Sequence, residues 1–264
     1  MWLMRAMAAT LLVAAMALPS PAPSPTAMAA ERWQPTMADR LHIQLAGQLR
    51  VPAWATFVEV DGAETPAKTV LHLHASGLRV ACYVSAGSAE AYRADYGRIP
   101  ARVIGKRLDD WPDERWLDVR RTSLLAPVMK ARIEQCAHKG FDAIEFDNVD
   151  GWTHDTGFSI TRADSLRYLR WLITQGHAAG LAVGLKNALG LVPLVADDVD
   201  WALNEQCVEY DECDRYGPLV RRATPVFVLE YTGSQRHVCA VAGRADLIAQ
   251  RKHLELGAWS RPCD

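Results

Sequence analysis

The sequence predicts a single (β/α)8 barrel over residues 31–264, and three observations indicate this fold. Eight short apolar or β-branched runs alternate with helical segments along the chain. Alternation of this kind gives a parallel sheet covered by helices, and eight repeats in a domain of this length fit a closed barrel better than an open sheet. No glycine-rich phosphate loop follows the first run, which disfavours an open nucleotide-binding sheet.

The predicted elements follow one another without an internal repeat or a second domain. The clearest helix is predicted over residues 161–179, where Thr161 and Asp164 are spaced as a helix cap and Gly180 ends the pattern. A second helix is predicted over residues 124–139. The predicted strands are residues 56–60, 80–85, 116–119, 143–147, 182–186, 201–204, 226–230 and 254–258.

Residues 1–30 are predicted to be a signal peptide with a proline-rich spacer. Arg5 supplies a positive start, residues 8–18 form an apolar run, and Ala27-Met28-Ala29 is a small-x-small cleavage pattern. We expect cleavage after Ala29 or Ala30 and a secreted or periplasmic protein. A membrane anchor is the alternative, but the apolar run is too short to cross a hydrocarbon core of roughly 30 Å.

The charge of the chain is nearly balanced, with 29 basic and 31 acidic residues, and half of all residues are hydrophobic. Cleavage would remove only one charged residue, Arg5, and leave the remainder slightly acidic. This charge disfavours nucleic acid or an anionic membrane as the main partner. We expect a monomeric globular protein with a substantial core.

All six cysteines lie after the predicted cleavage point, where an oxidising compartment permits disulfides. Cys207 and Cys213 flank a short polar segment and are expected to pair, as are Cys239 and Cys263 near the C-terminus. Cys82 lies in an apolar strand and Cys136 on an apolar helix face, so we expect free buried thiols there. A zinc site is the alternative, but no C-x2-C or H-x3-H spacing supports it.

Polar side chains end strand after strand at the edge where a barrel carries its catalytic groups. A solvated loop would also be polar, but the sequences WLD, FDNVDGW and EY place aromatic residues among the acids, which favours a pocket. The strand-end residues are Asp61; Tyr83 and Ser85; Asp118; Glu145, Asp147 and Asp150; Lys186 and Asn187; Asn204 and Glu205; Glu230 and Tyr231.

The run AIEFDNVDG, residues 143–151, carries three carboxylates within six residues. The strand period points Glu145 and Asp147 into the barrel mouth and Ile144 and Phe146 toward the helices. Like charges this close need a compensating cation, for which Lys186 is the candidate, or the pKa of one of them rises. Carboxylates with separated pKa values can act as acid and base in one pocket.

Two carboxylates without a metal are the requirement of glycoside hydrolysis. A calcium or magnesium site at Asp147, Asn148 and Asp150 is the rival interpretation, but the run lacks the D-x-D-x-D-G spacing of a calcium loop. We therefore expect neither a metal nor a cofactor.

Six motifs follow one another over roughly residues 33–231. They are CYVSAGSAEAYRADY, WPDERWLDVR, GFDAIEFDNVDGW, GLAVGLKN, LNEQCVEYDEC and PVFVLEY. Together they resemble glycoside hydrolase family 114, the endo-α-1,4-polygalactosaminidase family of (β/α)8 barrels.

The resemblance implies an extracellular retaining hydrolase that cuts α-1,4-linked galactosamine polymers. Carried over by motif, Asp147 in FDN would be the nucleophile and Glu205 in NEQC the general acid/base. Trp152 and Tyr231, with Trp111 and Tyr83, are candidates for stacking on sugar faces. The residues that would line the sugar subsites are Asp61, Tyr83, Glu145, Asn148, Asp150, Lys186, Asn187 and Glu230.

An acidic rim at Glu209, Asp211 and Glu212 would attract a partly deacetylated, cationic amino-sugar polymer. Two other functions stay open at this point. The barrel could bind carbohydrate without cleaving it, or it could be a metal-dependent hydrolase of another extracellular polymer.

Overall fold

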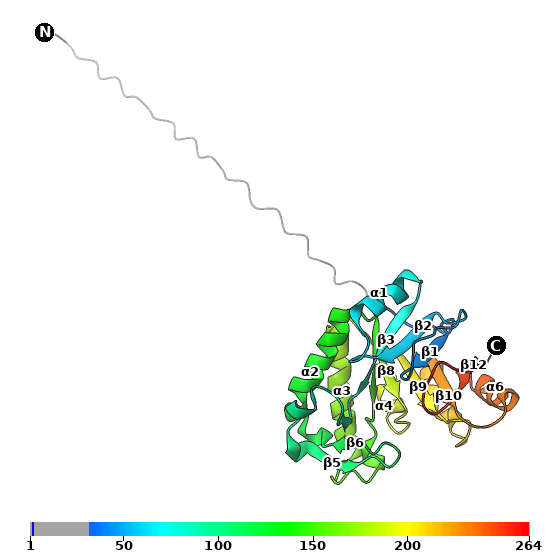
Figure 1. Cartoon of the computed structure of the whole chain (residues 1–264). Coiled ribbons are helices and arrows are strands. Elements are labelled where there is room, and N and C mark those ends of the chain that lie inside the picture. Colours follow the sequence, from blue (N-terminus) through cyan, green and yellow to red (C-terminus); the bar gives the residue numbers. More distant parts are fainter. Residues whose placement is uncertain (1, 3–31, 264) are drawn as a thin grey trace.

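A computed structural model of the chain describes Trp2 and residues 32–263 (Figure 1). The predicted signal peptide, apart from Trp2, lies outside these residues. Within the described part, no helix is both long and apolar enough to cross a membrane.

The fold is a TIM barrel whose sheet holds eight parallel strands and one antiparallel strand in the order β1-β2-β3-β7-β8-β9-β10-β11-β12. The predicted fold class is therefore confirmed. The strands are β1 Leu41–Gln44, β2 Phe57–Asp61, β3 Arg79–Ser85, β7 Ala143–Asp147, β8 Ala182–Lys186, β9 Trp201–Glu205, β10 Val226–Glu230, β11 Ile248–Lys252 and the antiparallel β12 Ser260–Pro262.

The two ends of this sheet, β1 and β12, meet without a strand ladder in residues 32–263. Individual hydrogen bonds close the seam instead. Gln250 Nε2 on β11 donates to the Leu41 carbonyl at 2.7 Å, and the Leu45 amide donates to the Leu256 carbonyl at 2.9 Å. The seam lies beside the C-terminus in Figure 1.

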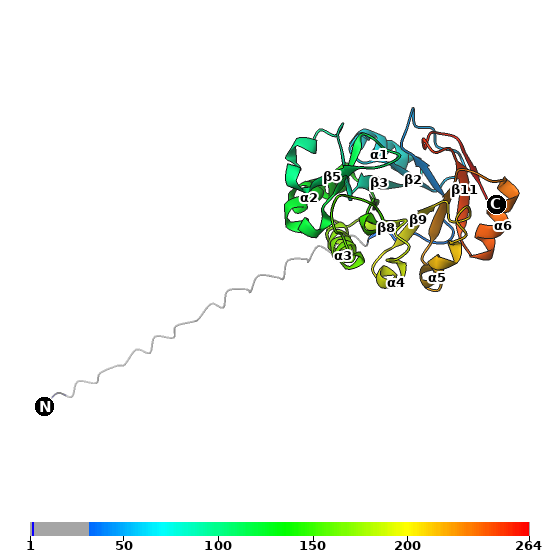
Figure 2. The same cartoon turned by 90° about the horizontal axis from the view of Figure 1, so that it is seen from below.

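Helices cover the outside of the sheet (Figure 2). The two helices predicted from the sequence are confirmed as α2 and α3. A capping box of Thr161 and Asp164 starts α3, while Gly140, at φ 88°, follows the last residue of α2. The helices are α1 Ala67–Ala75, α2 Thr122–Lys139, α3 Arg162–Ala178, α4 Val192–Val195, α5 Gly217–Val220 and α6 Gln235–Arg244.

An antiparallel sheet is inserted between β3 and α2, in the order β4-β6-β5. Its strands are β4 Ser88–Glu90, β5 Ile104–Arg107 and β6 Glu114–Leu117. The predicted strand 116–119 belongs here, so its assignment to the barrel was wrong. The sequence pattern could not distinguish the two sheets, because side chains alternate with the same period in the barrel strands and in the inserted strands. Asp118 caps the short 3-10 helix Val119–Arg121 by accepting from the Arg120 amide, so it does not end a barrel strand as predicted.

The first and last barrel strands were also predicted wrongly. β1 was missed, and the predicted strand 254–258 lies beyond β11. β11 carries buried polar residues: Gln250 bonds across the seam, and Lys252 donates to the Gly257 carbonyl at 2.6 Å. A strand whose buried positions are polar lacks the apolar pattern on which the prediction relied.

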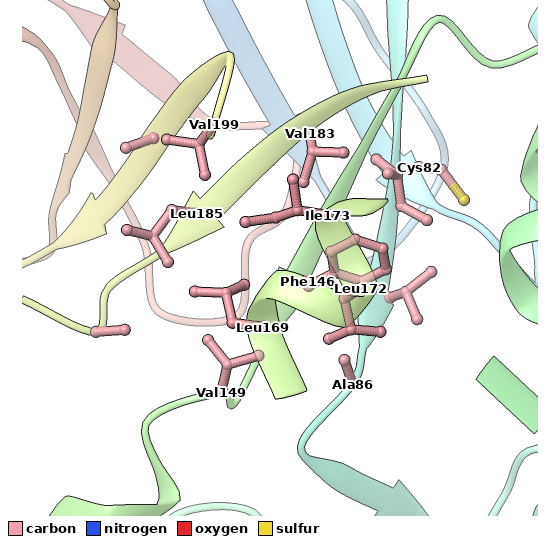
Figure 3. Packing of buried hydrophobic residues seen from close by; sticks show 14 of the residues in the cluster. Cys82, Ala86, Phe146, Val149, Leu169, Leu172, Ile173, Val183, Leu185 and Val199 are labelled. Carbon is pink, nitrogen blue, oxygen red and sulfur yellow. The ribbon is translucent and has the colours of Figure 1, made fainter. Parts of the chain in front are cut away.

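Two apolar cores lie on the two faces of the sheet. Inside the barrel, the rings of Phe57, Trp201 and Phe227 meet edge-on or tilted, with centroids 5.2 to 6.0 Å apart. Outside, Phe146 on β7 and Val183 on β8 pack against Leu169, Leu172 and Ile173 of α3 (Figure 3). Because each face of the sheet buries its own set of apolar side chains, the strands have a fixed register. This register determines which residues point into the barrel.

Three disulfides join the six cysteines. The predicted pairs Cys207–Cys213 and Cys239–Cys263 are confirmed. The expectation of free thiols at Cys82 and Cys136 was wrong, because they form a disulfide between β3 and α2 with their Cα atoms 6.0 Å apart. Cys82 points outward from β3 toward α2, which carries Cys136. Because the two cysteines are 54 residues apart, the sequence alone does not indicate that they are in contact.

Gly184 on β8 allows Trp201 to fill the barrel interior, because a Cβ at this position would lie 2.3 Å from the Trp201 ring. We predict that Gly184→Ala lowers the free energy of unfolding by about 1–3 kcal/mol through overpacking, as measured by urea denaturation. The control is Gly97→Ala, whose Cβ would meet nothing within 4 Å. Equal stability of the two variants would contradict this account of the interior packing.

Candidate active site

A cleft of about 640 Å³ opens at the carboxyl ends of the parallel strands. Its floor holds residues from β3, β7, β8 and β9, and one wall comes from the inserted segment between β3 and α2. The lining residues are Leu45, Ala46, Asp61, Tyr83, Glu90, Tyr92, Arg93, Leu108, Asp109, Asp110, Trp111, Pro112, Asp113, Glu114, Trp116, Asp147, Asn148, Asp150, His154, Lys186, Asn187, Glu205, Gln206, Leu254, Glu255 and Leu256.

Asp147 ends β7 on the inward side of the strand. Its Oδ1 accepts from the Asn148 amide at 2.7 Å, and its Oδ2 accepts from the Tyr83 hydroxyl at 3.0 Å and from Lys186 Nζ at 3.3 Å. Burial raises the pKa of Asp147 above its usual value, with Lys186 acting in the opposite direction.

Glu205 ends β9 and faces the same cation. Its Oε2 lies 3.2 Å from Lys186 Nζ and accepts from Asn187 Nδ2 at 3.2 Å, while its Oε1 accepts from the Tyr231 hydroxyl. Burial alone would raise the pKa of Glu205, but Lys186 and these two donors lower it below its usual value. The two carboxyl groups therefore have separated pKa values although they share one pocket.

Lys186 is buried between the two carboxylates at the end of β8, with 3% of its surface exposed. Burial would lower the pKa of its ammonium, but Asp147, Glu205 and Glu145 raise it well above the usual value. The facing oxygens of Asp147 and Glu205 lie no further apart than the sum of their distances to Nζ, 3.3 and 3.2 Å. The Lys186 ammonium thus compensates the negative charge of the two carboxylates and limits the distance between them.

The backbone turns sharply after each of these three residues. Asn148, Asn187 and Gln206 follow Asp147, Lys186 and Glu205, and they have φ values of 60°, 48° and 68°. Side chains other than glycine rarely adopt this left-handed conformation, and asparagine is among those that tolerate it best. Two of the turns provide donors, because the Asn148 amide bonds Asp147 and the Asn187 side chain bonds Glu205.

The structure brings most of the sequence-predicted residues to this cleft. Tyr231 is also present, through its hydroxyl bond to Glu205. Asp61 is held on the wall by Arg93, whose guanidinium donates to both of its oxygens at 2.9 and 2.6 Å. The predicted residues in the lining are Asp61, Tyr83, Asp147, Asn148, Asp150, Lys186, Asn187 and Glu205.

Three predicted residues lie elsewhere. Glu145 points into the barrel but is fully buried below the cleft. Glu230 is also buried, and its carboxylate accepts from the Val208 amide at 2.7 Å, so it holds the loop after β9. Trp152 packs over Gly190, where an added Cβ would lie 3.2 Å from its ring. Glu230 does not reach the cleft because side chains alternate between the two faces of β10. Leu229 belongs to the interior cluster, so Glu230 points outward.

Sequence reasoning missed a polar network on the inserted segment. Arg93 also bonds Glu90 at 2.6 Å, and Ser88 donates to Glu114. Burial raises the pKa of Glu114 to about 7. Glu90 and Arg93 lie within the motif CYVSAGSAEAYRADY, but the assignment of residues 116–119 to the barrel concealed that this segment reaches the cleft.

Ten acidic side chains line the cleft, against Arg93 and Lys186 as its fixed cations, so the cleft itself is strongly acidic. The acidic rim expected at Glu209, Asp211 and Glu212 does not belong to the lining. Glu209 instead accepts from Gln206 at 3.1 Å and from Thr232 at 2.9 Å. No group of three or more histidine, cysteine or acidic residues in residues 32–263 is arranged to hold a metal ion.

Comparison with solved structures finds several similar barrels. Aspergillus fumigatus Ega3, in complex with galactosamine, matches with a TM-score of 0.84 and 31% identity, over 90% of this chain and 100% of that chain. The glycoside hydrolase domain of PelA from Pseudomonas aeruginosa matches with a TM-score of 0.65 and 16% identity, over 83% and 96% of the two chains. A search of curated proteins gave no match.

The fold alone does not determine the activity. A morphinone reductase in complex with tetrahydroNAD matches with a TM-score of 0.51 and 12% identity, over 75% of this chain and 74% of that chain. A TIM barrel with paired carboxylates on the floor of a cleft is an arrangement that glycoside hydrolases use. The profile of Glycoside-hydrolase family GH114 matches residues 22–264. The chain belongs to this family and is a glycoside hydrolase, which confirms the resemblance found in the sequence motifs.

Proposed function

We propose that this protein is a secreted, retaining endo-glycosidase that cleaves α-1,4-linked, galactosamine-containing polysaccharide. Asp147 is the nucleophile and Glu205 the general acid/base. The observation that carries the proposal is the placement of both carboxylates on one buried ammonium, at 3.3 and 3.2 Å. This limits their separation to a range that includes the roughly 5–5.5 Å typical of retaining enzymes.

The reaction has two steps. Asp147 attacks the anomeric carbon of the bound sugar while Glu205 donates its proton to the departing glycosidic oxygen, which leaves a glycosyl-enzyme ester. Glu205, now a carboxylate, removes a proton from water, whose oxygen attacks the same carbon and releases Asp147. The sugar keeps its anomeric configuration, and Glu205 regains its proton.

Binding of an amino sugar would also give Asp147 and Glu205 the protonation states that the first step needs. In the free protein the pKa of Asp147 is raised by burial and that of Glu205 is lowered by Lys186, the reverse of what the first step needs. A galactosamine ring carries its ammonium on the carbon next to the anomeric carbon, and therefore close to Asp147. This charge favours ionised Asp147 and leaves the proton to Glu205.

Endo cleavage requires a cleft that continues beyond the catalytic pair. Two separate parts of the rim contribute to the lining: Ala46 and Leu256 at the barrel seam, and the segment between β3 and α2. On that segment Tyr92 and Trp111 are exposed by 62% and 47%, so their rings are free to stack on sugars.

Secretion and the monomeric state belong to the same proposal. The predicted signal peptide and the three disulfides favour an oxidising extracellular or periplasmic compartment. The substrate class is further supported by the galactosamine bound to Ega3 and by the ten acidic residues lining this cleft.

The proposed roles are tested with Asp147→Asn and Glu205→Gln on a soluble α-1,4-galactosamine oligosaccharide. We expect each variant to lose at least about 10²–10⁴-fold in kcat, because each removes a group that acts in bond cleavage, while the melting temperature stays within a few degrees. Glu134→Gln, on the exposed face of α2, is the control with full activity. Hydrolysis by either variant at the control rate would refute the assignment, and proton NMR of the first-formed anomer tests retention.

The wall of the cleft is tested with Tyr92→Ala against Tyr210→Ala. Both tyrosines are 62% exposed, but only Tyr92 lines the cleft. We expect Tyr92→Ala to raise KM for the polymer roughly three- to tenfold, the worth of one aromatic contact, and Tyr210→Ala to leave KM unchanged. Equal effects in steady-state assays would place the polymer elsewhere.

The acidic cleft predicts a salt effect that depends on the charge of the polymer. Raising the ionic strength from about 0.05 to about 0.5 M should increase KM for deacetylated galactosamine polymer several-fold, because salt screens exposed charges. KM for the N-acetylated polymer should change little. The same salt response with both polymers would exclude electrostatic capture.

A further inference from the structure

Two glutamates that face one another in the barrel interior are unused by the mechanism above. Glu59 on β2 and Glu145 on β7 are both fully buried. Both point inward from their strands. On β2, Glu59 lies between Phe57 of the interior cluster and Asp61 of the cleft, and on β7, Glu145 lies between Ala143 and Asp147 in the same way. They therefore form a layer between the apolar plug and the catalytic pair.

No donor within residues 32–263 reaches any of the four carboxyl oxygens of Glu59 and Glu145. The nearest cation is Lys186, whose Nζ lies 3.9 Å from Glu145 Oε1, beyond hydrogen-bond distance and closer to Asp147 and Glu205. The charged groups that face the pair are Lys186, Asp147 and Glu205. Two ionised carboxylates without donors would be strongly disfavoured here.

We infer that Glu59 and Glu145 are a hydrogen-bonded acid pair in which both carboxyl groups are protonated at neutral pH, and that this pair positions Lys186 between Asp147 and Glu205. A proton held between the two carboxyl groups supplies the hydrogen bond that the rest of the barrel does not. The positioning role rests on the proposed function of Asp147 and Glu205. The protonation of the pair does not.

Protonation of this pair decides where the ammonium sits. A protonated pair does not compete for Lys186, which then remains with the two catalytic carboxylates. Burial raises the pKa of Glu59 to about 8 and that of Glu145 well above its usual value. Ionisation above this pH would place a new anion below Lys186 and draw the ammonium away from the cleft.

Thermodynamic linkage gives a test that needs no substrate. The folded protein keeps a proton on Glu59 that the unfolded chain releases above about pH 4.5, so this group makes stability fall as pH rises from there to about pH 8. Glu59→Gln keeps the size and hydrogen bonding of the protonated acid but cannot ionise. In urea unfolding between about pH 5 and 8, the unfolding constant of the wild type should rise relative to this variant by up to about tenfold per pH unit.

Glu134→Gln, an exposed change on α2, is the control that should track the wild type at every pH. A merely structural role for Glu59 would give an offset that is independent of pH, and this result would overturn the protonation of the pair.

Infrared spectroscopy gives a second test that remains available if Glu59→Gln fails to fold. Near neutral pH, the double variant Glu59→Gln with Glu145→Gln should lose part of the carbonyl band of protonated carboxyl groups that the wild type shows. That component should remain in Asp147→Asn and in Glu114→Gln, which are included because the pKa of Asp147 is also raised and that of Glu114 is about 7. A double variant whose band equals that of the wild type would overturn the inference.

The positioning role is tested by the pH profile of kcat. Because Glu59→Gln cannot release a proton near pH 8, its loss of activity on the alkaline side should move to higher pH. An unchanged alkaline limb would refute the positioning role. If the catalytic assignment itself were wrong, Asp147→Asn and Glu205→Gln would show it separately, while the unfolding and infrared results would still report on the pair.

Discussion

The candidate active site depends on one buried cation. The Lys186 ammonium lies within 3.3 Å of a carboxylate from each neighbouring strand, Asp147 on β7 and Glu205 on β9. Two carboxylates this close would repel each other in a largely buried pocket, and a buried lysine without anions would lose its charge. The ammonium offsets the repulsion between the two carboxylates, so the loss of Lys186 would leave both of them uncompensated, whereas the loss of one carboxylate would leave a balanced ion pair.

The packing that stabilises the barrel also aims these groups. Phe146 and Leu185 face outward and belong to the core between sheet and helices, which fixes β7 and β8 in one register. Because side chains alternate along a strand, the next residues, Asp147 and Lys186, must then point inward. A slip by one residue would bury Phe146 in the mouth and turn Asp147 toward α3. The precision of the acid pair thus comes from apolar contacts on the opposite face of the sheet.

The sequence predicted the middle of the barrel well because its parallel strands are buried on both faces and appear as apolar runs that end in polar residues. This covers β7, β8, β9 and β10, and with them Asp147, Lys186 and Glu205. Prediction failed where burial is polar or pairing is distant, as in the Gln250 strand, the Cys82–Cys136 disulfide and the inserted sheet. Glu59 was overlooked because an acid inside an apolar strand is normally interpreted as solvent-facing, and only the closed barrel shows that its face is interior.

The acidity of the cleft is tolerable because its charges occupy three different environments. Asp109, Asp110 and Asp113 are exposed at the rim, where water screens them and they contribute mainly a long-range field. Deeper in the cleft, Asp61 is paired with Arg93, and Asp147 and Glu205 are paired with Lys186. Below them, no donor within residues 32–263 reaches Glu59 or Glu145, and burial there favours the protonated form of a carboxyl group. The proposed attraction of a cationic polymer and a defined protonation state at Asp147 and Glu205 can therefore coexist, because the first depends on solvated charges and the second on buried ones.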